Sequence, residues 1–449
     1  MRKYVSILNI LQQQIKERHY LPGQKLPSIR QAAKQYACSQ STVIRAYLEL
    51  EKEHFIYSVP QSGFYVVGES SLERSQSNGE ERIDFASVGP DAHLFPYLDF
   101  QHCTNKAIDT YKYKLFSYGN HQELENLRKT LVWHLANDQI FPKQEQIVIT
   151  AGVQPAMELL AKIPFPNGHS EILVEQPSYG IYLRYLEEEG IPVRSIPRTM
   201  EGIDLVELER IFKNGSIKFF YTMPRHHNPL GTTYGVNERK KISQLASKYN
   251  VYIVEDDYMA DLGGERKYEP IFAYNRTGHV VYLKSFSKII FPGLKLGAVV
   301  LPELLYQTFQ VHNKRNGAAL LSQATLEVYI KNGMYERHKR HLYTEYSARL
   351  QTLKEALLNY NNRGLIEPYP SSPGFYMSLK LPASVNLESL QERLMARGVR
   401  VSLGKRFYLS TFLNREKFIR LSISRVSGQE ISEGIRIIVQ EVEELTKSS

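Results

Sequence analysis

The sequence predicts a protein of two parts: a small helical module with a two-stranded hairpin, followed by a large α/β domain with a largely parallel sheet. Helical periodicity and a short alternating stretch mark the module, which spans residues 1–67. A polar stretch at residues 68–82 contains almost no residue that would enter a core. From residue 83 to 449, short apolar runs alternate with helical stretches, the pattern of an α/β fold.

Composition indicates a soluble globular protein. The 449 residues suffice for two or three domains with a large core, and 42% hydrophobic and 23% charged residues are ordinary values for this class. The two cysteines, Cys38 and Cys103, lie far apart and match no metal-ligand spacing, so we expect no disulfide framework, no metal site and a reducing cytoplasm. No apolar run is long enough to span a membrane, and the N-terminus lacks a signal-peptide core.

Three helices are expected in the N-terminal module. The first begins near Tyr4, with apolar residues on one stripe, and stops at Pro22-Gly23. Ser28 caps the second helix, and Gln31 occupies the capping-box position three residues later. A short turn then leads into the third helix, for which Ser39 is the expected N-cap.

The second and third helices, joined by a tight turn, form a helix-turn-helix, and the alternating stretch FIYSVPQSGFYVV adds a hairpin wing. In such modules the second of the two helices enters the DNA major groove with its N-terminal residues at the base edges. Residues 1–67 carry nine Lys and Arg against four Glu, which is +5 of the net +9 and favours a polyanionic partner. Charge alone is equally compatible with a solvated basic face.

The stretch LPSIRQAAKQYACSQSTVIRAYLELEKEHFIYSVPQSGFYV resembles the winged-helix domain of GntR-type bacterial transcription regulators. The resemblance implies that double-stranded DNA is contacted by Arg30, Ser39, Thr42 and Arg45, with Gly63 at the wing tip. The family usually has Arg where this chain has Gln40, which can pair with adenine but brings no charge. A winged helix used for protein contacts is the alternative.

The stretch at residues 68–82, GESSLERSQSNGEER, is expected to be a flexible linker. A random coil of this length spans on the order of 20 Å on average. The module is then tethered to the large domain, and one dimer can place two modules on DNA.

Six apolar runs of the large domain are expected to be strands of an α/β sheet with largely parallel strands. They begin at Ile147, Ile172, Phe219, Val251, Val280 and Leu296. Ligands of such sheets bind at the carboxyl ends of the strands, so the polar residues that follow these runs are candidates for one site.

Each strand end offers a group suited to one part of a phosphorylated pyridine ring. A glycine turn at Gly152, followed by Val153 and Gln154, opens a helix whose free amides would seat a phosphate. Tyr179 offers an aromatic face, Asn228 an amide for a phenolic oxygen, and Asp256 a carboxylate that keeps a pyridine nitrogen protonated.

The stretch YLKSFSKIIFPGLKLG delivers Lys288 from a strand end into a small loop with Ser285 and other hydroxyls. Burial there lowers the pKa of a lysine and makes it a nucleophilic amine, while the hydroxyls suit an anion. Such a lysine can hold pyridoxal phosphate (PLP) as a Schiff base. Taken alone, the stretch also fits an ordinary surface lysine after a strand.

The ordered set of residues over about 83–449 resembles fold-type I PLP-dependent aminotransferases, which implies a smaller α+β subdomain at about 330–449. The resemblance makes Lys288 the Schiff-base lysine, Asp256 the pyridine-nitrogen partner and Tyr179 the ring stacker. The other implied contacts are Tyr258 and Asn228 to O3′; Ser285, Gly152, Val153 and Gln154 to the phosphate; Arg420 to a substrate carboxylate; and Tyr118 to the phosphate of a neighbouring subunit. Shared sites imply a homodimer.

Some positions depart from that family. Lys295 replaces an arginine expected at the phosphate, and Glu123 stands where glycine is common. Arg225 and the pair His226-His227 would either bind a second anionic group of an effector or only lie on the surface. Tyr182 and Arg184, just beyond the stacking tyrosine, are further candidates for effector contacts.

A GntR-type winged helix joined to an aminotransferase-like domain is the arrangement of MocR/GabR-type regulators, and the resemblance covers the whole chain. It implies a cytoplasmic bacterial transcription regulator, without a membrane partner, that senses an amino compound through aldimine chemistry at Lys288. Alternatives are an active aminotransferase that also binds DNA, and a repressor whose large domain only dimerises. PLP itself could also be the effector.

Overall fold

The computed structural model describes residues 3–17, 19–21, 24–52, 55–59, 63–66, 83–116, 124–262, 268–313, 317–371 and 374–447. The chain divides into two compact units, Met1–Glu81 and Arg82–Ser449. Residues 68–82, Tyr118 and Glu123 lie outside the described residues, so the expected linker and subunit-bridging tyrosine stay predictions. No helix in the described ranges is long and apolar enough to cross a membrane.

The N-terminal unit contains the predicted helix-turn-helix and wing. Its elements are α1 (Lys3–Lys16), α2 (Ile29–Gln35), α3 (Gln40–Lys52) and the antiparallel hairpin of β1 (Ile56–Val59) and β2 (Gly63–Val66). Leu11, Val43 and Tyr47 are fully buried between the helices, and the Tyr47 hydroxyl donates to the Pro27 carbonyl at 2.8 Å. This hydrogen bond fixes α3 against the chain that leads into α2.

Both predicted helix caps are confirmed. The Gln31 amide donates to Ser28 Oγ at 3.3 Å while the Ser28 amide donates to Gln31 Oε1 at 2.9 Å, a reciprocal capping box at the start of α2. The Thr42 amide donates to Ser39 Oγ at 3.3 Å at the start of α3. Local hydrogen bonding therefore sets where both helices of the motif begin.

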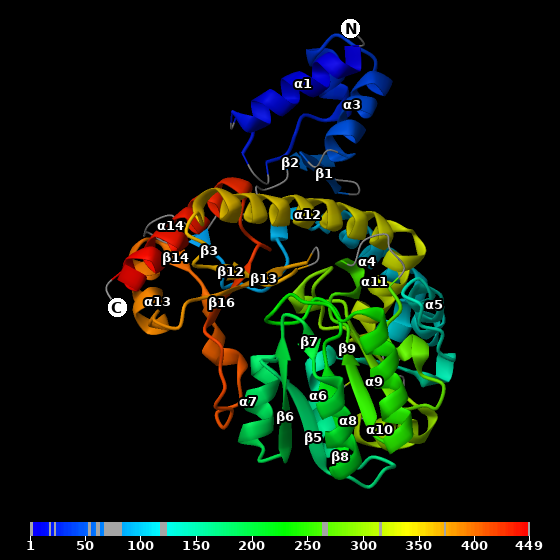
Figure 1. Ribbon diagram of the computed structural model, residues 1–449. Coiled ribbons are helices and arrows are strands. Elements are labelled where there is room, and N and C mark those ends of the chain that lie inside the picture. Colours follow the sequence, from blue (N-terminus) through cyan, green and yellow to red (C-terminus); the bar gives the residue numbers. More distant parts are fainter. Residues whose placement is uncertain are drawn as a thin grey trace. The chain divides into compact units, whose positions relative to one another are not determined.

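An eight-stranded sheet forms the centre of the large unit (Figure 1). Its order is β4 (Ile147–Thr150), β11 (Gly297–Val300), β10 (Val280–Ser285), β9 (Tyr252–Asp256), β8 (Ile217–Thr222), β5 (Glu171–Gln176), β6 (Val193–Thr199) and β7 (Gly202–Ile203). Strands β10, β9, β8, β5 and β6 are parallel, whereas β11 runs antiparallel to both its neighbours. The predicted α/β class is confirmed, and β6 was not expected because VRSIPRT contains no apolar run.

Alternate residues of the parallel strands enter two different cores. On β5, Ile172 and Val174 belong to the larger core, whereas Leu173 belongs to a second core with residues of α8 and α9. Burial of both faces explains why these strands are continuous apolar runs. The helices of this part are α4 (Tyr97–Tyr111), α5 (Glu125–Ala136), α6 (Val153–Lys162), α7 (Gly180–Glu188), α8 (Leu205–Asn214), α9 (Val236–Tyr249), α10 (Glu303–Asn313) and α11 (Leu320–Lys331).

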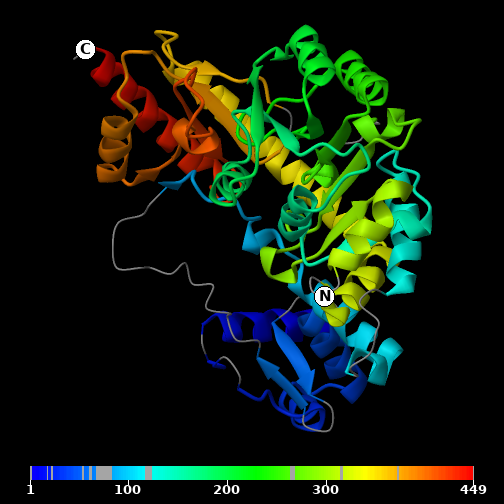
Figure 2. The same ribbon diagram turned by 90° about the horizontal axis from the view of Figure 1, so that it is seen from below.

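A second, antiparallel sheet lies in a smaller C-terminal subdomain. Its strands are β12 (Glu367–Pro368), β13 (Tyr376–Lys380), β16 (Phe418–Ser422) and β15 (Ser402–Leu403), with helices α13 (Leu387–Ala396) and α14 (Gly428–Lys447). The long helix α12 (Met334–Tyr360) joins the two parts (Figure 2). Its residue Leu342 lies in the larger core and Leu350 in the core of the small subdomain.

The first described residues of the large unit belong to the small subdomain. Strand β3 (Ile83–Asp84) pairs in parallel with β14 (Val399–Arg400), and Phe85 is fully buried in the core of this subdomain. The chain then passes Val88 on its way to α4, and Val88 lines the cavity described next.

Candidate functional site

A cavity of about 630 Å³ lies at the carboxyl ends of the large sheet and is closed on one side by the small subdomain. Most residues singled out in the sequence come together in its wall: Gly152, Val153, Gln154, Tyr179, Arg184, Asn228, Asp256, Tyr258, Ser285, Lys288, Lys295 and Arg420. Because β4, β10, β9, β8 and β5 all end at this edge, residues far apart in sequence meet there.

The start of α6 forms a seat for an anion. Gly152 precedes the helix with φ of 99°, a conformation that favours glycine. A Cβ atom at Gly297 on β11 would lie 2.9 Å from the Gly152 carbonyl carbon and 3.1 Å from the Val153 nitrogen, so only glycine lets the two backbones approach. The first amides of α6 have no helical partner, and Val153 and Gln154 line the cavity, which suits a phosphate.

Asp256, the last residue of β9, keeps one carboxylate oxygen unused. The Tyr221 hydroxyl donates to Asp256 Oδ2 at 2.8 Å, whereas the buried Oδ1 has no hydrogen-bond partner among the described residues. Burial raises the pKa of Asp256 to about 7, against the lowering effect of the Tyr221 hydrogen bond. A buried carboxylate with an unused oxygen in a cavity fits a cationic ring nitrogen.

Lys288 lies in the loop after β10, and its amine donates to the Val88 carbonyl at 2.6 Å. Among the described residues, no carboxylate forms an ion pair with this amine. Its positive charge opposes the burial that raises the pKa of Asp256, so the two groups lie close enough to interact electrostatically. Among the described residues, the hydrogen-bond acceptor of this amine is thus a neutral carbonyl and not a carboxylate.

Arg420, on β16, is a buried cation that faces the cavity without a counter-anion in the described part of the chain. Its guanidinium donates to Asn228 Oδ1 at 2.9 Å and to Ser402 Oγ at 3.2 Å, while its Nε has no hydrogen-bond partner in the part of the chain that the structure describes. Burial lowers the pKa of Arg420, as expected for an uncompensated charge. Because arginine only donates, the Asn228 oxygen is committed to Arg420 and its NH₂ group remains to donate elsewhere.

The two predicted tyrosines of the site, Tyr258 and Tyr179, differ in their hydrogen bonding and exposure. The Tyr258 hydroxyl donates to the His226 carbonyl at 2.6 Å, which fixes this ring at the cavity wall. Tyr179 lies at the start of α7 and retains some exposure, with its pKa raised to about 12 by burial and by the nearby Asp256. Its ring lines the cavity as a stacking residue would.

Tyr182 does not line the cavity, so the prediction that it contacts an effector is wrong. It is 1% exposed, and its ring packs against Tyr221 at a centroid distance of 4.7 Å. Positions 182 and 184 are about 200° apart around a helix. Because Arg184 faces the cavity from one side of α7, Tyr182 lies on the other side of the helix, in the core.

Arg225, His226 and His227 are buried and do not line the cavity, so neither expectation for them holds. Arg225 pairs with Asp257 through Nε–Oδ1 at 2.5 Å and Nη2–Oδ2 at 2.7 Å. His227 Nε2 lies 3.2 Å from Glu175 Oε2, and burial lowers the pKa of His227 to about 4, which keeps it neutral at pH 7.

Glu175 anchors the loop that carries Asn228. It accepts from Arg198 at 2.6 Å, from the Thr222 hydroxyl at 2.8 Å and from the Met223 amide at 3.2 Å. All of these groups are buried, so the loop after β8 rests on a buried polar network centred on Glu175. The charged run in this loop is structural.

Several residues of the site were not singled out in the sequence. The cavity wall also contains Ala86, Val88, Tyr376, Ser402 and Arg406, all outside the strand ends of the large sheet. Tyr221 supports Asp256 from within β8. Nothing in the strand-end pattern marks these positions, because they reach the site through the small subdomain or from the interior of a strand.

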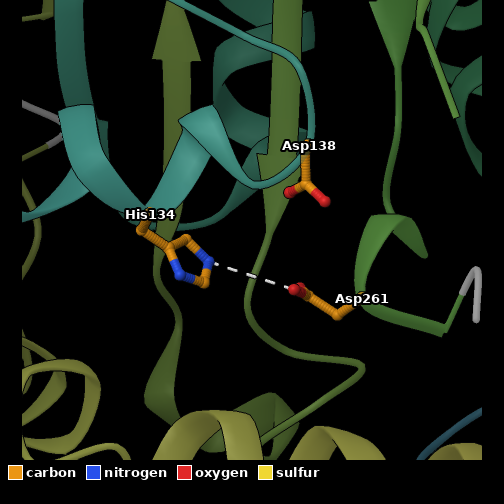
Figure 3. Close-up of side chains that lie close together, drawn as sticks. All are labelled: His134, Asp138 and Asp261. Atoms are coloured by element: carbon orange, nitrogen blue, oxygen red, sulfur yellow. Dashed lines mark ion pairs between the residues drawn. The ribbon is translucent and has the colours of Figure 1, made fainter. Parts of the chain in front are cut away.

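Away from this cavity, His134, Asp138 and Asp261 point toward one another in a buried cluster (Figure 3). The Lys284 amine donates to Asp138 Oδ2 at 2.7 Å and to Asp261 Oδ1 at 3.0 Å, so a lysine already supplies the cation between the carboxylates. Burial alone would raise the pKa of Asp261, but the Lys284 charge outweighs it and the pKa is lowered. Burial also lowers the pKa of His134 to about 4, so its 3.9 Å contact with Asp261 is not an ion pair at pH 7.

In the N-terminal unit, Arg30, Ser39, Gln40 and Arg45 are exposed, and Thr42 is partly so. The Arg45 guanidinium lies 4.4 Å from the centre of the Tyr4 ring, which ties α3 to α1. Lys25, which was not among the predicted DNA contacts, packs against the wing. A Cβ atom at Gly63 would lie 3.1 Å from Lys25 Cε. The described module therefore presents basic side chains from α2, from α3 and from the segment before α2 that pairs with the wing.

Comparisons with known proteins match both units. The family model "Aminotransferase class I and II" matches residues 81–438, and the model "Bacterial regulatory proteins, gntR family" matches residues 3–66. The uncharacterized HTH-type transcriptional regulator YcxD of Bacillus subtilis is 44% identical over 444 residues, which cover 98% of this chain and 99% of that protein.

Solved structures resemble the large unit. The multiple substrate aminotransferase of Thermococcus profundus is 26% identical with a TM-score of 0.76, covering 85% of this chain and 97% of that one. LysN, an alpha-aminoadipate aminotransferase from Thermus thermophilus in complex with N-(5′-phosphopyridoxyl)-L-leucine, is 25% identical with a TM-score of 0.73, covering 85% of this chain and 96% of that one.

Proposed function

The chain belongs to the aminotransferase class I and II family and carries an N-terminal domain of the gntR family, and from this we propose a regulator that uses PLP to sense an amino compound. DNA binding and transcription regulation follow from the gntR domain and from the full-length regulators that the chain resembles. Sensing through Lys288 is the part that we propose.

One observation carries the cofactor proposal: buried Asp256 keeps an unused oxygen in the same cavity as Lys288. The start of α6 would hold the phosphate together with Ser285 and Lys295, and the Asn228 amide would donate to the phenolic oxygen. Bound PLP supplies an aldehyde that condenses reversibly with primary amines, so an amino compound would compete with Lys288 for it.

Arg420 supports an effector that carries a carboxylate. Its buried guanidinium has no counter-anion among the described residues, and its fork of donors suits a planar carboxylate. When the Lys288 amine is not engaged with the cofactor, the Val88 carbonyl holds it. The cavity therefore has separate places for the effector's acid group and for the lysine.

We further propose a homodimer that reads double-stranded DNA through α3 and the wing of each subunit. Arg30 and Arg45 would contact phosphates, and the exposed Gln40 at the start of α3 would reach base edges. The contribution of Tyr118 to a neighbouring site stays a prediction from the family.

Screening amines and amino acids for changes in the absorbance of the PLP-loaded protein tests the proposal. The expected result is a spectral change with one class of amino compound, accompanied by a change in DNA affinity measured by fluorescence anisotropy. A protein that takes up no PLP would overturn the proposal and favour a large unit that only dimerises. DNA affinity that follows PLP alone, without an added amine, would make PLP the effector.

A second candidate function is aminotransferase turnover by the same site. It is favoured by the Lys288 amine, which lies in the cavity outside any ion pair with a described residue and is thus free to carry a proton. Steady-state formation of a keto acid from an amino acid would support turnover. A spectral change that stops after one equivalent of amino acid would support sensing alone.

A further inference from the structure

Helix α3 exposes two apolar side chains on a face that points away from the core of the N-terminal unit. Ile44 is 40% exposed and Leu48 is 53% exposed, and neither is part of the described hydrophobic core of this unit. They stand one helical turn apart, so they share one side of α3. Each follows a fully buried residue, Val43 or Tyr47, and successive positions of a helix are about 100° apart. The described part of the unit therefore leaves an apolar strip of α3 open to solvent.

The charge around this strip suits a polyanion. The stretch of residues 24–48, which contains α2 and most of α3, has no Asp or Glu. It carries four cationic residues, which are Lys25, Arg30, Lys34 and Arg45. Apolar side chains set in a basic surface without acidic groups favour DNA as the partner that covers them.

The hydroxyl groups at the start of α3 are engaged in its N-terminal cap. Ser39 Oγ lies 2.8 Å from Ser41 Oγ and 2.8 Å from Thr42 Oγ1. Gln40 is exposed and takes no part in these hydrogen bonds of the described chain. Gln40 and Ile44 are one turn apart, so an amide and an apolar side chain stand next to each other at the end of the helix that would enter a major groove.

These two side chains match the two partners of an A·T pair. In the major groove adenine offers N7 and N6 to a glutamine amide, and thymine offers its C5-methyl group to an apolar side chain. Positions 40 and 44 are about 6 Å apart along the helix axis, which is close to two base-pair steps of about 3.4 Å. Gln40 and Ile44 can therefore reach neighbouring base pairs of one half-site.

We propose that Ile44 is a specificity-determining residue that contacts the C5-methyl group of a thymine in the DNA major groove. The inference rests on the proposed function, in which α3 reads double-stranded DNA, and adds an A·T pair next to the one that Gln40 contacts. The contact removes apolar surface of both groups from water. A G·C pair at the same place offers no methyl group and leaves polar base edges against an isoleucine, which cannot pair with them.

The test removes the methyl group and the isoleucine separately and together. Full-length wild-type protein first selects duplexes from a randomised DNA pool. One selected duplex is then resynthesised with deoxyuridine in place of each thymidine in turn, which removes only the C5-methyl group. Anisotropy titrations compare the wild type, Ile44→Ala and Ile44→Val on every duplex. Ile10→Ala is the matched control, because Ile10 on α1 is 43% exposed, close to the 40% of Ile44, and lies outside the helix-turn-helix.

We expect deoxyuridine at one thymidine of a half-site to weaken wild-type binding about fourfold, the effect of withdrawing one buried methyl group. Ile44→Ala should lose this sensitivity, Ile44→Val should keep part of it and Ile10→Ala should keep all of it. A merely structural role of Ile44 would not couple the two removals in this way.

Two results would overturn the methyl contact: no effect of deoxyuridine on the wild type, or equal sensitivity of the wild type and Ile44→Ala at every thymidine. Salt-dependent binding to the selected duplex would in that case still support the DNA function. A changed oligomeric state of Ile44→Ala in the ultracentrifuge, at equal sensitivity to deoxyuridine, would overturn the proposal in favour of a protein partner for this strip. Absence of binding to any duplex would instead overturn the proposed DNA function itself.

Discussion

The Lys288 amine donates a 2.6 Å hydrogen bond to the carbonyl of Val88, in the segment with which the described part of the large unit begins. Two residues earlier, the Ala86 carbonyl accepts from Arg420 at 3.3 Å. The lysine that would meet the cofactor and the arginine that would meet the effector thus share one backbone segment as a hydrogen-bond partner. A change of partner at either cation changes what holds that segment.

Lys288→Ala should abolish the absorbance of covalently bound PLP. Of the lysines in the described cavity wall, Lys288 is the one whose charge acts on the pKa of Asp256. DNA affinity in the absence of effector should remain close to that of the wild type, since Lys288 lies in the other compact unit. Absorbance spectra and anisotropy titrations check the two expectations. Lys405→Ala serves as the control, and unchanged colour in Lys288→Ala would refute the assignment.

Asp256→Asn should stabilise the cofactor-free protein, relative to the wild type, more at pH 8 than at pH 5. The folded-state pKa of Asp256 is raised to about 7, so its contribution is favourable below the unfolded pKa and is lost as pH rises through the folded value. Asparagine cannot lose a proton, and the gain between the two pH values should be on the order of 2 kcal/mol. Urea unfolding at both pH values measures it, and a pH-independent difference would contradict the raised pKa.

Lys284→Met should destabilise the protein strongly, because it removes the buried amine that hydrogen-bonds both Asp138 and Asp261 in the interior. Loss of one partner from a buried ionic cluster costs roughly 3–5 kcal/mol. Lys248→Met is the matched control, since Lys248 pairs with Glu209 at the surface and should change the unfolding midpoint little. Equal midpoints for both variants would show that the buried cluster contributes nothing through Lys284.

Arg30→Ala should weaken DNA binding on every sequence tested and reduce the slope of log affinity against log salt by about one. The side chain is exposed on α2, where it has no described acidic partner, so its loss should not disturb the fold of the module. Anisotropy titrations at several salt concentrations measure the slope. Arg436→Ala, in the other unit, should leave the slope unchanged, and an unchanged slope in Arg30→Ala would exclude a phosphate contact.

Strand ends were predictable from the sequence because apolar runs mark the strands and the groups that follow them share one edge of the sheet. Gly152, Asp256 and Lys288 were placed in one site in this way, and the structure brings them to one cavity. Arg406 and Val88 were not predictable, since their places depend on how the small subdomain and its first segment dock. Tyr182 and Arg184 were predicted together from their nearness to Tyr179, but helix α7 directs the two side chains to different sides.

The pairing of Ile83–Asp84 with Val399–Arg400 fixes the start of the described large unit to the small subdomain. A Cβ atom at Gly434 would lie 2.4 Å from the Phe85 ring, so the start of this unit is clamped into the same subdomain that carries Arg406 and Arg420. Along the chain, the DNA module is therefore followed first by the small subdomain and not by the large sheet, after whose strand β10 Lys288 lies. A ligand held by Arg420 would therefore contact the same subdomain in which the described chain of the large unit begins.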